Sequence, residues 1–458
     1  MWEPDELAAA AGGQGYGKER RLVGVCIDSR AISPGALFLA LQGTRVDGHD
    51  FVEEAITRGA AAVVVSRHTS PQWLQKTGLG WQALAPQCFV IEVEDTLTAL
   101  QRMAAWHRLR FDIPLIGVTG SNGKTTTKDM IAAILSRSGG VCATAGNLNN
   151  HIGLPLSLLG LTASHRVAVI EIGISRPGEM KTLCEIARPT IGLVTNIGPA
   201  HLEFLGDLEG VAREKKQLFD GVSTRIVNLD DPYMSPMATQ QARAWTYSQQ
   251  GPADVAATHI RPHTRHTAFR LAIQGQDCGE VALATFGRHQ VSNALAATSA
   301  ALSVGTTISD IIEGLAQYQP SAMRMQTIHA KGFHVLLDAY NANPDSMKAA
   351  ITALCNQPGR KLALLGDMLE LGIHALDLHR EVGRFVAACG VNRLIAVGQW
   401  ASAMVEGAQE GGLHESAAYP EPTAAQDALQ RMLQPDDWLL IKGSRGLKME
   451  TVLPVLGL

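Results

Sequence analysis

Short runs of β-branched and other apolar residues recur along the chain, and between them lie longer stretches with apolar residues at helical spacing. Near the N-terminus, the runs at residues 22–27, 36–41 and 62–66 predict strands, because turns containing glycine and proline separate them. The segment 95–110 opens with Asp95 and Thr96, either of which could cap a helix, and continues at near-helical spacing. The pattern predicts a compact α/β domain followed by a connecting helix.

The same alternation continues to the end of the chain. Runs at residues 166–173, 192–196 and 225–229 predict strands separated by helical stretches, and this rhythm favours a mostly parallel sheet covered on both faces. Beyond residue 320 the rhythm returns, with predicted strands at residues 335–338, 361–366, 393–398 and 438–442. A chain of 458 residues is too long for one ordinary domain. We therefore expect an α/β protein of three domains, over residues 1–95, 96–320 and 321–458.

Composition and charge exclude several classes of protein. Hydrophobic residues make up 46% and charged residues 18% of the chain, which argues against extensive disorder. The formal net charge is −4 and no basic block occurs, so we expect no general binding of nucleic acid. No apolar run approaches the roughly 18 residues of a membrane helix, and acidic residues open the chain where a secretory signal would be basic. Seven scattered cysteines without a Cys-x-x-Cys pair suit a reducing compartment, so we expect a cytoplasmic protein.

The segment GVTGSNGKTTT at residues 117–127 carries the clearest chemical signal. It joins the apolar run at 113–118 to a stretch of helical spacing, which is the strand, glycine-rich turn and helix order of a phosphate-binding loop. It matches the shorter G-x-x-G-K-T pattern, because Val118 stands where the longer pattern has glycine. Backbone N–H groups and the positive helix end would hold phosphate oxygens, and the lysine would add charge. We expect ATP to bind through Gly120, Ser121, Asn122, Gly123, Lys124, Thr125 and Thr126; the alternative is a glycine turn with an exposed lysine.

Three more polar residues lie after predicted strands or on a predicted helix. Glu171 ends an apolar run, where open α/β sheets place ligand-facing groups, so Glu171, Thr125, phosphate oxygens and water form a candidate Mg²⁺ site. Taken alone, Glu171 is a polar residue at a strand end. His201 lies on a loop, and a lone histidine is usually a surface or core residue. Lys215 lies in an amphipathic segment at residues 210–219, and the spacing alone assigns it to a solvated charged face.

Together these motifs resemble the Mur ligase family, whose members add amino acids or a dipeptide to the bacterial cell-wall precursor. The resemblance spans nearly the whole chain. It is carried by GVTGSNGKTT at 117–126, GNLNNHIGLP at 146–155, EIG at 171–173, TNIGPAHLE at 195–203 and Lys215. Within the family, PGE at 177–179, DAYNANPDSM at 338–347 and GDMLELG at 366–372 are similar to the member that adds D-alanyl-D-alanine to UDP-N-acetylmuramoyl-tripeptide.

The resemblance implies a fold and a set of partners. A central phosphate-loop ATPase domain with a parallel sheet would be flanked by an N-terminal α/β domain that holds the UDP sugar and a C-terminal Rossmann-like domain that receives the dipeptide. The partners would be UDP-N-acetylmuramoyl-tripeptide and D-alanyl-D-alanine, and we expect a monomer. The residues expected to bind the UDP substrate are Ser29, Arg30, Asp47, His49, Asn149 and Asn150. The run at residues 28–30 reads equally well as a turn with a side-chain hydrogen bond.

The resemblance also implies roles around the nucleotide. Lys215 would be carbamylated by carbon dioxide and would hold a second Mg²⁺ near His201. The expected catalytic residues are therefore Lys124, His201 and Lys215. Asn293 matches the asparagine on the adenine side, whereas its spacing alone suggests a helix N-terminal region. Arg324 and Asp338 match residues that reach the phosphates and ribose, although by themselves they are a linker cation and a capping residue. Residues 442–445 and Asp345 lie where a C-terminal domain could bind the dipeptide.

The expected activity is an ATP-dependent ligation of a carboxylate to an amine through an acyl phosphate, in synthesis of the peptidoglycan precursor. One alternative is another enzyme of the superfamily, such as the member that adds the third residue or a folylpolyglutamate synthetase-like ligase. The segments PGE at 177–179 and YNAN at 340–343 argue against both. A second alternative is a nucleotide-dependent switch that hydrolyses ATP to change the state of a partner.

Overall fold

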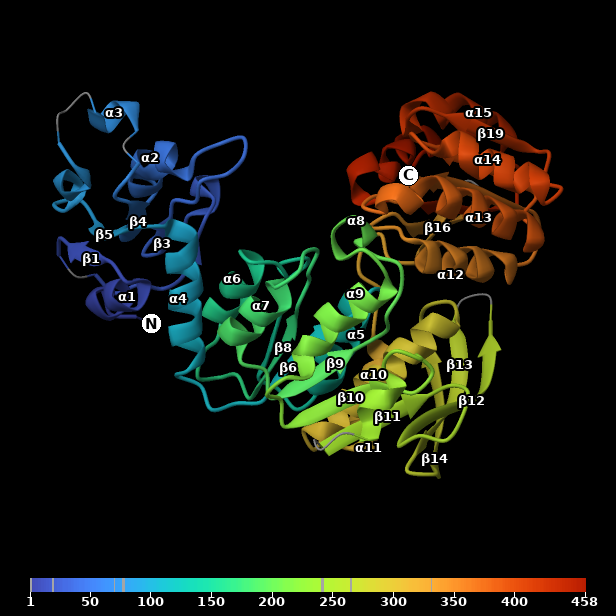
Figure 1. Ribbon diagram of the computed structural model, residues 1–458, viewed down its shortest axis with the longest axis horizontal. Coiled ribbons are helices and arrows are strands. Elements are labelled where there is room, and N and C mark those ends of the chain that lie inside the picture. The colour runs from blue at the N-terminus through green and yellow to red at the C-terminus, as the bar shows by residue number, and fades with distance from the viewer. Residues whose placement is uncertain are drawn as a thin grey trace. The chain divides into compact units, whose positions relative to one another are not determined.

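The computed structural model describes residues 2–18, 20–69, 71–75, 79–239, 243–263, 266–330 and 332–458 (Figure 1). In these residues the strands form three sheets, of five, nine and six strands. The chain divides into two compact units, one of Met1–Leu115, Gly140–Gly173 and Lys181–Pro189, the other of Ile116–Gly139, Ile174–Met180 and Thr190–Leu458. The expected α/β class is confirmed, and the boundaries at residues 95 and 320 stay a prediction. No described helix combines the length and the apolar composition needed to cross a membrane.

The first unit contains the five-stranded sheet, in the order β1-β5-β4-β3-β2. Its strands are β1 (Gln14–Tyr16), β2 (Val25–Cys26), β3 (Leu37–Leu39), β4 (Ala62–Ser66) and β5 (Phe89–Val93). Neighbours pair in parallel except β1, which runs antiparallel to β5. All five residues of β4 are buried, as expected for a central parallel strand covered on both faces. The strand predicted at 62–66 is therefore confirmed, while those at 22–27 and 36–41 shorten to β2 and β3.

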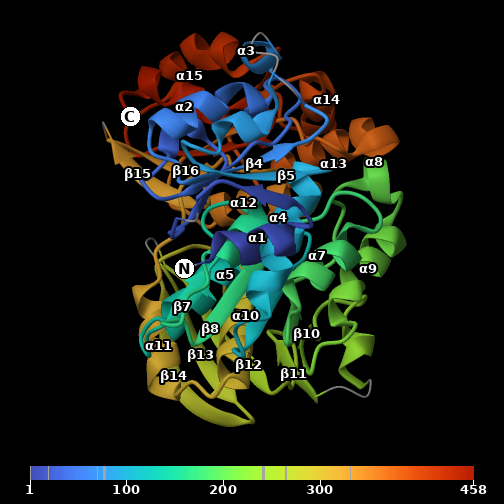
Figure 2. The ribbon, with the colours of Figure 1, turned by 90° about the vertical axis from the view of Figure 1, so that its left-hand side faces the viewer.

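Helices complete this unit. They are α1 (Pro4–Ala11), α2 (Val52–Thr57), α3 (Gln72–Gln75), α4 (Thr96–Arg108) and α6 (Gly153–Leu159), together with most of α7 (Glu179–Ala187). The Asp95 side chain accepts a hydrogen bond from the backbone N–H of Thr98 at 2.6 Å, so of the two predicted capping residues it is Asp95 that caps α4. Figure 2 shows α1 beside α4. Strands β7 (Val141–Ala143) and β8 (Val167–Glu171) pair in parallel, and Glu171 is the last residue of β8.

Among the described residues, the second unit contains seven strands of the nine-stranded sheet, in the order β14-β13-β12-β11-β10-β9-β6. They are β6 (Leu115–Thr119), β9 (Ile191–Val194), β10 (Thr224–Asn228), β11 (Arg243–Ser248), β12 (Val255–Pro262), β13 (Thr267–Ile273) and β14 (Gln276–Leu283). Pairing is parallel from β6 to β12 and antiparallel from β12 to β14. The mostly parallel sheet is confirmed, and its antiparallel extension was not predicted. The helices are α5 (Lys124–Leu135), α8 (Leu202–Leu205), α9 (Leu208–Lys216), α10 (Arg288–Ser303) and α11 (Ile308–Gln317).

The six-stranded sheet also belongs to the second unit and has the order β15-β16-β20-β17-β18-β19. Its strands are β15 (Gln326–Ala330), β16 (Phe333–Asp338), β17 (Lys361–Gly366), β18 (Arg393–Val397), β19 (Ser416–Tyr419) and β20 (Trp438–Lys442). Only β15 pairs antiparallel. Figure 1 shows α12 (Pro344–Cys355), α13 (Ala375–Ala388), α14 (Ala401–Glu410) and α15 (Gln426–Met432) around this sheet. Because parallel strands end on one edge, Asp338 and Lys442 meet there.

Candidate nucleotide-binding site

The phosphate loop joins the end of β6 to the start of α5, as predicted. Gly120 and Gly123 have φ angles of 144° and 81°, which side-chain-bearing residues rarely adopt. A β-carbon at Gly120 would lie 1.9 Å from Thr195 Oγ1, and one at Gly123 would lie 2.3 Å from Asn293 Oδ1. Both positions therefore require glycine, because of the backbone conformation and because neighbouring side chains approach so closely.

The segment that follows β9 holds this loop in place. The backbone N–H of Ser121 donates to the backbone oxygen of Asn196 at 2.9 Å, and the backbone N–H of Asn122 donates to Asn196 Oδ1 at 3.0 Å. Thr195 Oγ1 donates to the Asn122 carbonyl at 2.5 Å. The Lys124 ammonium lies over the loop and donates to the carbonyl oxygen of Gly120 at 2.8 Å. The loop therefore leads directly into the N-terminus of α5, whose first turn contains Lys124 and the buried Thr125 and Thr126. A glycine-rich loop, a lysine and a helix N-terminus in this arrangement bind phosphate groups.

Lys215 lies at the C-terminal end of α9, and it is buried, with 1% of its surface exposed. The prediction of a solvated face was therefore wrong for Lys215, because packing of α9 covers this side of the helix. Burial lowers the pKa of the Lys215 ammonium well below its ordinary value, the charge of Lys124 lowers it further, and Glu214 acts in the opposite direction. Burial and the charge of Lys124 therefore both disfavour the charged form of the Lys215 side chain relative to an exposed lysine.

His201 lies on the loop before α8, with a left-handed backbone (φ 58°). Its ring Nδ1 lies 2.5 Å from Glu370 Oε2, and this hydrogen bond lowers the pKa of the Glu370 carboxyl. The backbone N–H of Glu203 donates to the Glu370 carbonyl at 3.1 Å. The motif at 366–372 therefore contacts the motif at 195–203, a pairing that sequence reasoning missed.

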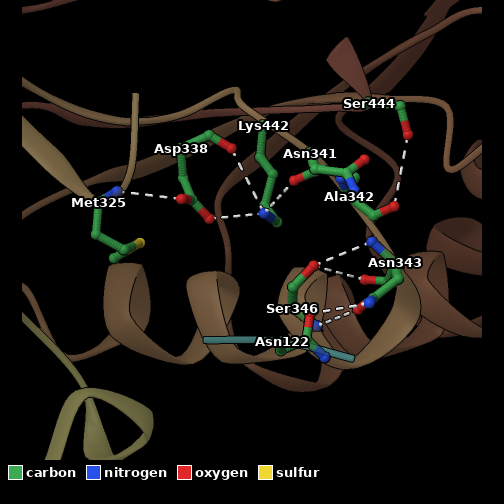
Figure 3. Close-up of polar contacts among 9 residues, drawn as sticks. All are labelled: Asn122, Met325, Asp338, Asn341, Ala342, Asn343, Ser346, Lys442 and Ser444. Carbon is green, nitrogen blue, oxygen red and sulfur yellow. Dashed lines mark hydrogen bonds and ion pairs between the residues drawn. The ribbon is translucent and has the colours of Figure 1, made fainter. Parts of the chain in front are cut away.

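Asn293, Arg324 and Asp338 also belong to the second unit. Asn293 is buried on α10 beside Gly123, and its Nδ2 donates to Gln290 Oε1 at 3.2 Å. The Arg324 guanidinium lies 4.0 Å from the centre of the Tyr340 ring. Asp338 Oδ1 accepts from the backbone N–H of Met325 at 3.1 Å, and Oδ2 pairs with Lys442 Nζ at 2.6 Å (Figure 3). Lys442, considered at first only for the dipeptide, is thus a buried partner of Asp338.

In the first unit, Glu171 lies at the end of β8 with 1% of its surface exposed. Its Oε1 accepts a hydrogen bond from Asn149 Nδ2 at 2.7 Å, while its buried Oε2 has no hydrogen-bond partner among the described residues. Asn150 Oδ1 accepts from the backbone N–H of Gly153 at 2.9 Å, at the start of α6. A buried carboxylate oxygen without a partner is costly, so this atom is a candidate cation ligand.

The remaining predicted residues lie at two short loops of the first unit. Arg30 forms an ion pair with Asp28 at 2.6 Å and is mostly exposed, while Ser29 is buried and donates to Glu54 Oε2 at 2.9 Å. Asp47 Oδ1 accepts from His49 Nδ1 at 2.6 Å, and His49 Nε2 accepts from the backbone N–H of Ser66 at 2.9 Å. Both ring nitrogens of His49 are therefore engaged within the protein.

No three His, Cys, Asp or Glu side chains gather into a metal site in the part of the chain that is described. A magnesium site among these residues would therefore need hydroxyl, phosphate or water oxygens in addition to carboxylates. All seven cysteines are free thiols.

Comparison with protein families gives three matches along the chain. The Mur ligase family catalytic domain matches residues 21–108, the Mur ligase middle domain residues 118–301, and the domain described as "Mur ligase, glutamate ligase domain" residues 323–445. Two similar relatives are UDP-N-acetylmuramoyl-tripeptide–D-alanyl-D-alanine ligases. The one from Escherichia coli (strain K12) is 36% identical, covering 98% of this chain and 97% of its own length. The one from Bacillus subtilis (strain 168) is 35% identical, with coverages of 94% and 92%.

Solved structures that are similar to this chain belong to the same kind of ligase. A crystal structure of MurF from Acinetobacter baumannii aligns with a TM-score of 0.87 at 32% identity, covering 99% of this chain and 98% of that chain. A crystal structure of MurF ligase from Thermotoga maritima in complex with ADP aligns with a TM-score of 0.80 at 26% identity, with coverages of 94% and 96%.

Proposed function

The chain belongs to the Mur ligase family, and from that premise we propose that it adds D-alanyl-D-alanine to UDP-N-acetylmuramoyl-tripeptide with ATP. The reaction is an ATP-dependent ligation in peptidoglycan precursor synthesis, and it releases ADP and phosphate. Relatives of this name match over almost the full length of both chains, which supports the assignment of the whole activity. The ADP-bound neighbour supports ATP as the nucleotide.

The observation that carries this proposal is the phosphate loop. Two glycines with left-handed backbones, a lysine over the loop and the N-terminus of α5 form an anion-binding site where a triphosphate would sit. We assign nucleotide binding to residues 120–126, with Asn293, Arg324 and Asp338. Arg324 and Asp338 belong to the same unit as the loop, which is compatible with contacts to phosphate and ribose.

Magnesium is assigned to Thr125, Glu171, His201 and Lys215, with two ions. Glu171 fits this role, because its Oε2 is a buried acceptor without a partner among the described residues and Mg²⁺ prefers oxygen ligands. Bound Mg²⁺ would neutralise charge on the phosphate oxygens. Lys215 fits only after modification, because an ammonium repels a cation. Its neutral amine can attack carbon dioxide, losing one proton and forming a carbamate whose oxygens carry negative charge.

The chemistry follows from the poor reactivity of a carboxylate toward an amine. The terminal carboxylate of the tripeptide attacks the γ-phosphorus of ATP, the bond to the β-phosphate oxygen breaks, and an acyl phosphate forms. The amine of D-alanyl-D-alanine then attacks the acyl carbon and gives up one proton to water, and phosphate leaves from the tetrahedral intermediate with the electron pair of the broken C–O bond. Lys124 would stabilise negative charge on the transferred phosphoryl group. Holding the three substrates in line can supply roughly 7 to 11 kcal/mol.

Substrate contacts complete the proposal. We assign the UDP substrate to an N-terminal domain of residues 1–95 through Ser29, Arg30, Asp47 and His49, with Asn149 and Asn150 from the central domain of residues 96–320. The exposed Arg30 guanidinium is available to an anionic ligand, whereas His49 would act by fixing its loop. The C-terminal domain of residues 321–458 would receive the dipeptide. Free thiols and a nucleotide-linked substrate support the cytoplasm as the location, and we propose a monomer.

The test is phosphate release by the purified chain with Mg-ATP and UDP-N-acetylmuramoyl-tripeptide, with and without D-alanyl-D-alanine. We expect release that depends on both substrates, and a product whose mass has grown by the dipeptide. Lys124→Ala serves as the control and should abolish ligation. A product extended by one amino acid, or ATP turnover that ignores both substrates, would contradict the proposal.

A further inference from the structure

Asn122 of the phosphate loop makes a side-chain contact with the region of the six-stranded sheet. Asn343 Nδ2 donates to Asn122 Oδ1 at 2.9 Å, and the two residues are 221 positions apart (Figure 3). Asn343 caps α12: its Oδ1 accepts from the backbone N–H of Ser346 at 2.9 Å. Because that N–H can only donate, the amide orientation of Asn343 is fixed and its NH₂ group must face Asn122.

The segment that presents Asn343 is held at several points. Lys442, whose side chain is 2% exposed, donates to Asp338 Oδ2 at 2.6 Å and to the Asn341 carbonyl at 2.9 Å. Ser346 Oγ accepts from the backbone N–H of Asn343 at 3.0 Å, which closes the capping box. Figure 3 shows the Lys442 ammonium between Asp338 and Asn341, and Ser346 beside Asn343. The position of Asn343 is thus set by the end of β20 and by its own helix.

A second contact reaches the support of the phosphate loop. The backbone N–H and carbonyl of Gly198 both bond to Ser121 Oγ, at 2.9 Å each. A β-carbon at Gly198 would lie 2.3 Å from Asp345 Oδ2, in the first turn of α12. The start of α12 therefore packs against the loop at Asn122 and against the segment behind it at Gly198.

We propose that Asn343 is a positioning residue for the nucleotide: through Asn122 it sets the conformation of the phosphate loop from the side of the C-terminal domain. The inference rests on the proposed ligase function and adds a coupling between nucleotide binding and the start of α12. Docking of α12 adds one hydrogen bond to the supports of the loop and so favours its phosphate-binding form, which makes the use of ATP more efficient in that arrangement.

The experiment compares four variants of the full chain: Asn343→Ser, Ser346→Ala, Asn122→Ala, and Asn122→Ala combined with Asn343→Ser. Serine keeps a good N-cap but cannot reach Asn122, whereas Ser346→Ala disturbs the same cap and leaves the contact intact. Steady-state ligation gives kcat and KM for Mg-ATP, and thermal melting reports stability. Asn343→Thr repeats the test if the serine variant is unstable.

The expected result is a fall of about fivefold to tenfold in kcat/KM for Mg-ATP with Asn343→Ser, as for one neutral hydrogen bond. KM for the UDP substrate and the melting temperature should stay close to wild type, and Ser346→Ala should remain within about twofold. The double variant should be no worse than the poorer single variant, since both remove one contact.

Independent effects would overturn the inference: either a double variant whose loss equals the product of the single losses, or an equal loss with Ser346→Ala. A wild-type chain that binds ATP but does not ligate would contradict the proposed function instead. The two failures are therefore distinguishable in one set of assays.

Discussion

Replacing Lys442 with methionine should expose how strongly the edge of the six-stranded sheet depends on one buried cation. The Lys442 ammonium pairs with Asp338 at 2.6 Å, and the lysine and aspartate side chains are 2% and 17% exposed. Methionine fills nearly the same space but leaves the carboxylate without its partner. Breaking a buried pair costs roughly 3–5 kcal/mol, and the partial exposure of Asp338 places the loss near the lower figure, about 3 kcal/mol.

Hydrogen exchange measured by mass spectrometry suits this question, because it reports opening of one region and needs no two-state transition of a multidomain chain. A loss of about 3 kcal/mol should accelerate exchange in peptides covering β20 by about 100-fold. Peptides covering β4, in the other unit, provide the internal reference and should not change.

Two further variants sharpen the test. Lys361→Met makes the same substitution at the partly exposed start of β17 in the same sheet, and it should cost less than about 0.5 kcal/mol. Adding Asp338→Asn to Lys442→Met removes the unpaired charge, so exchange should be slower than in the single variant. If Lys442→Met accelerated exchange by less than about fivefold, or no more than Lys361→Met did, the reasoning on the buried pair would be refuted.

Three other measurements test single residues of the two units. Lys215→Ala should lose most ligation activity, and an added short carboxylic acid should restore part of it by taking the place of the carbamate; rates that stay at the unrescued level would count against the modification. Gly123→Ala should weaken Mg-ATP binding in calorimetry about tenfold, because left-handed strain of roughly 1–2 kcal/mol adds to crowding, with a β-carbon 2.3 Å from Asn293 Oδ1, and an affinity like that of wild type would contradict this. Arg30 lowers the pKa of the Asp28 carboxyl to about 2, so NMR should follow its titration there, and Arg30→Ala should return it toward 3.8. Since the folded pKa lies below the ordinary one, the stabilisation from Asp28 is complete above 3.8 and is lost as the pH falls to about 2; an unshifted titration would disprove the ion pair.

Three largely buried strands were predictable from the sequence with their bounds, whereas the buried strands β3, β8 and β9 have other bounds than predicted. The runs at residues 62–66, 361–366 and 438–442 are continuous and apolar, and the structure has strands over the same residues. The strands from β12 to β14 escaped prediction, since exposed polar residues interrupt their apolar pattern. The pattern of apolar and polar residues identifies a strand or helix only when buried and exposed positions follow each other regularly along it.

The candidate site divides in a similar way. The phosphate loop is local, so its glycines, lysine and helix start could be recognised from adjacent residues. Lys215 could not be placed by its helix pattern, because the cover over it comes from other elements. The pairs Asn122–Asn343, His201–Glu370 and Asp338–Lys442 join residues 221, 169 and 104 positions apart. Asn343 does carry a local capping signature with Ser346, but nothing in the sequence directs its amide to Asn122.

The sequence by itself determined the α/β class, the phosphate loop and the family, because these follow from local spacing and from motifs read along the chain. Tertiary structure decided which charges are buried, which carboxylate oxygen of Glu171 is left without a protein partner, and which side chains from distant segments support the loop. Burial and long-range hydrogen bonds depend on how elements pack, and packing is a property of the folded chain that no short stretch of sequence contains.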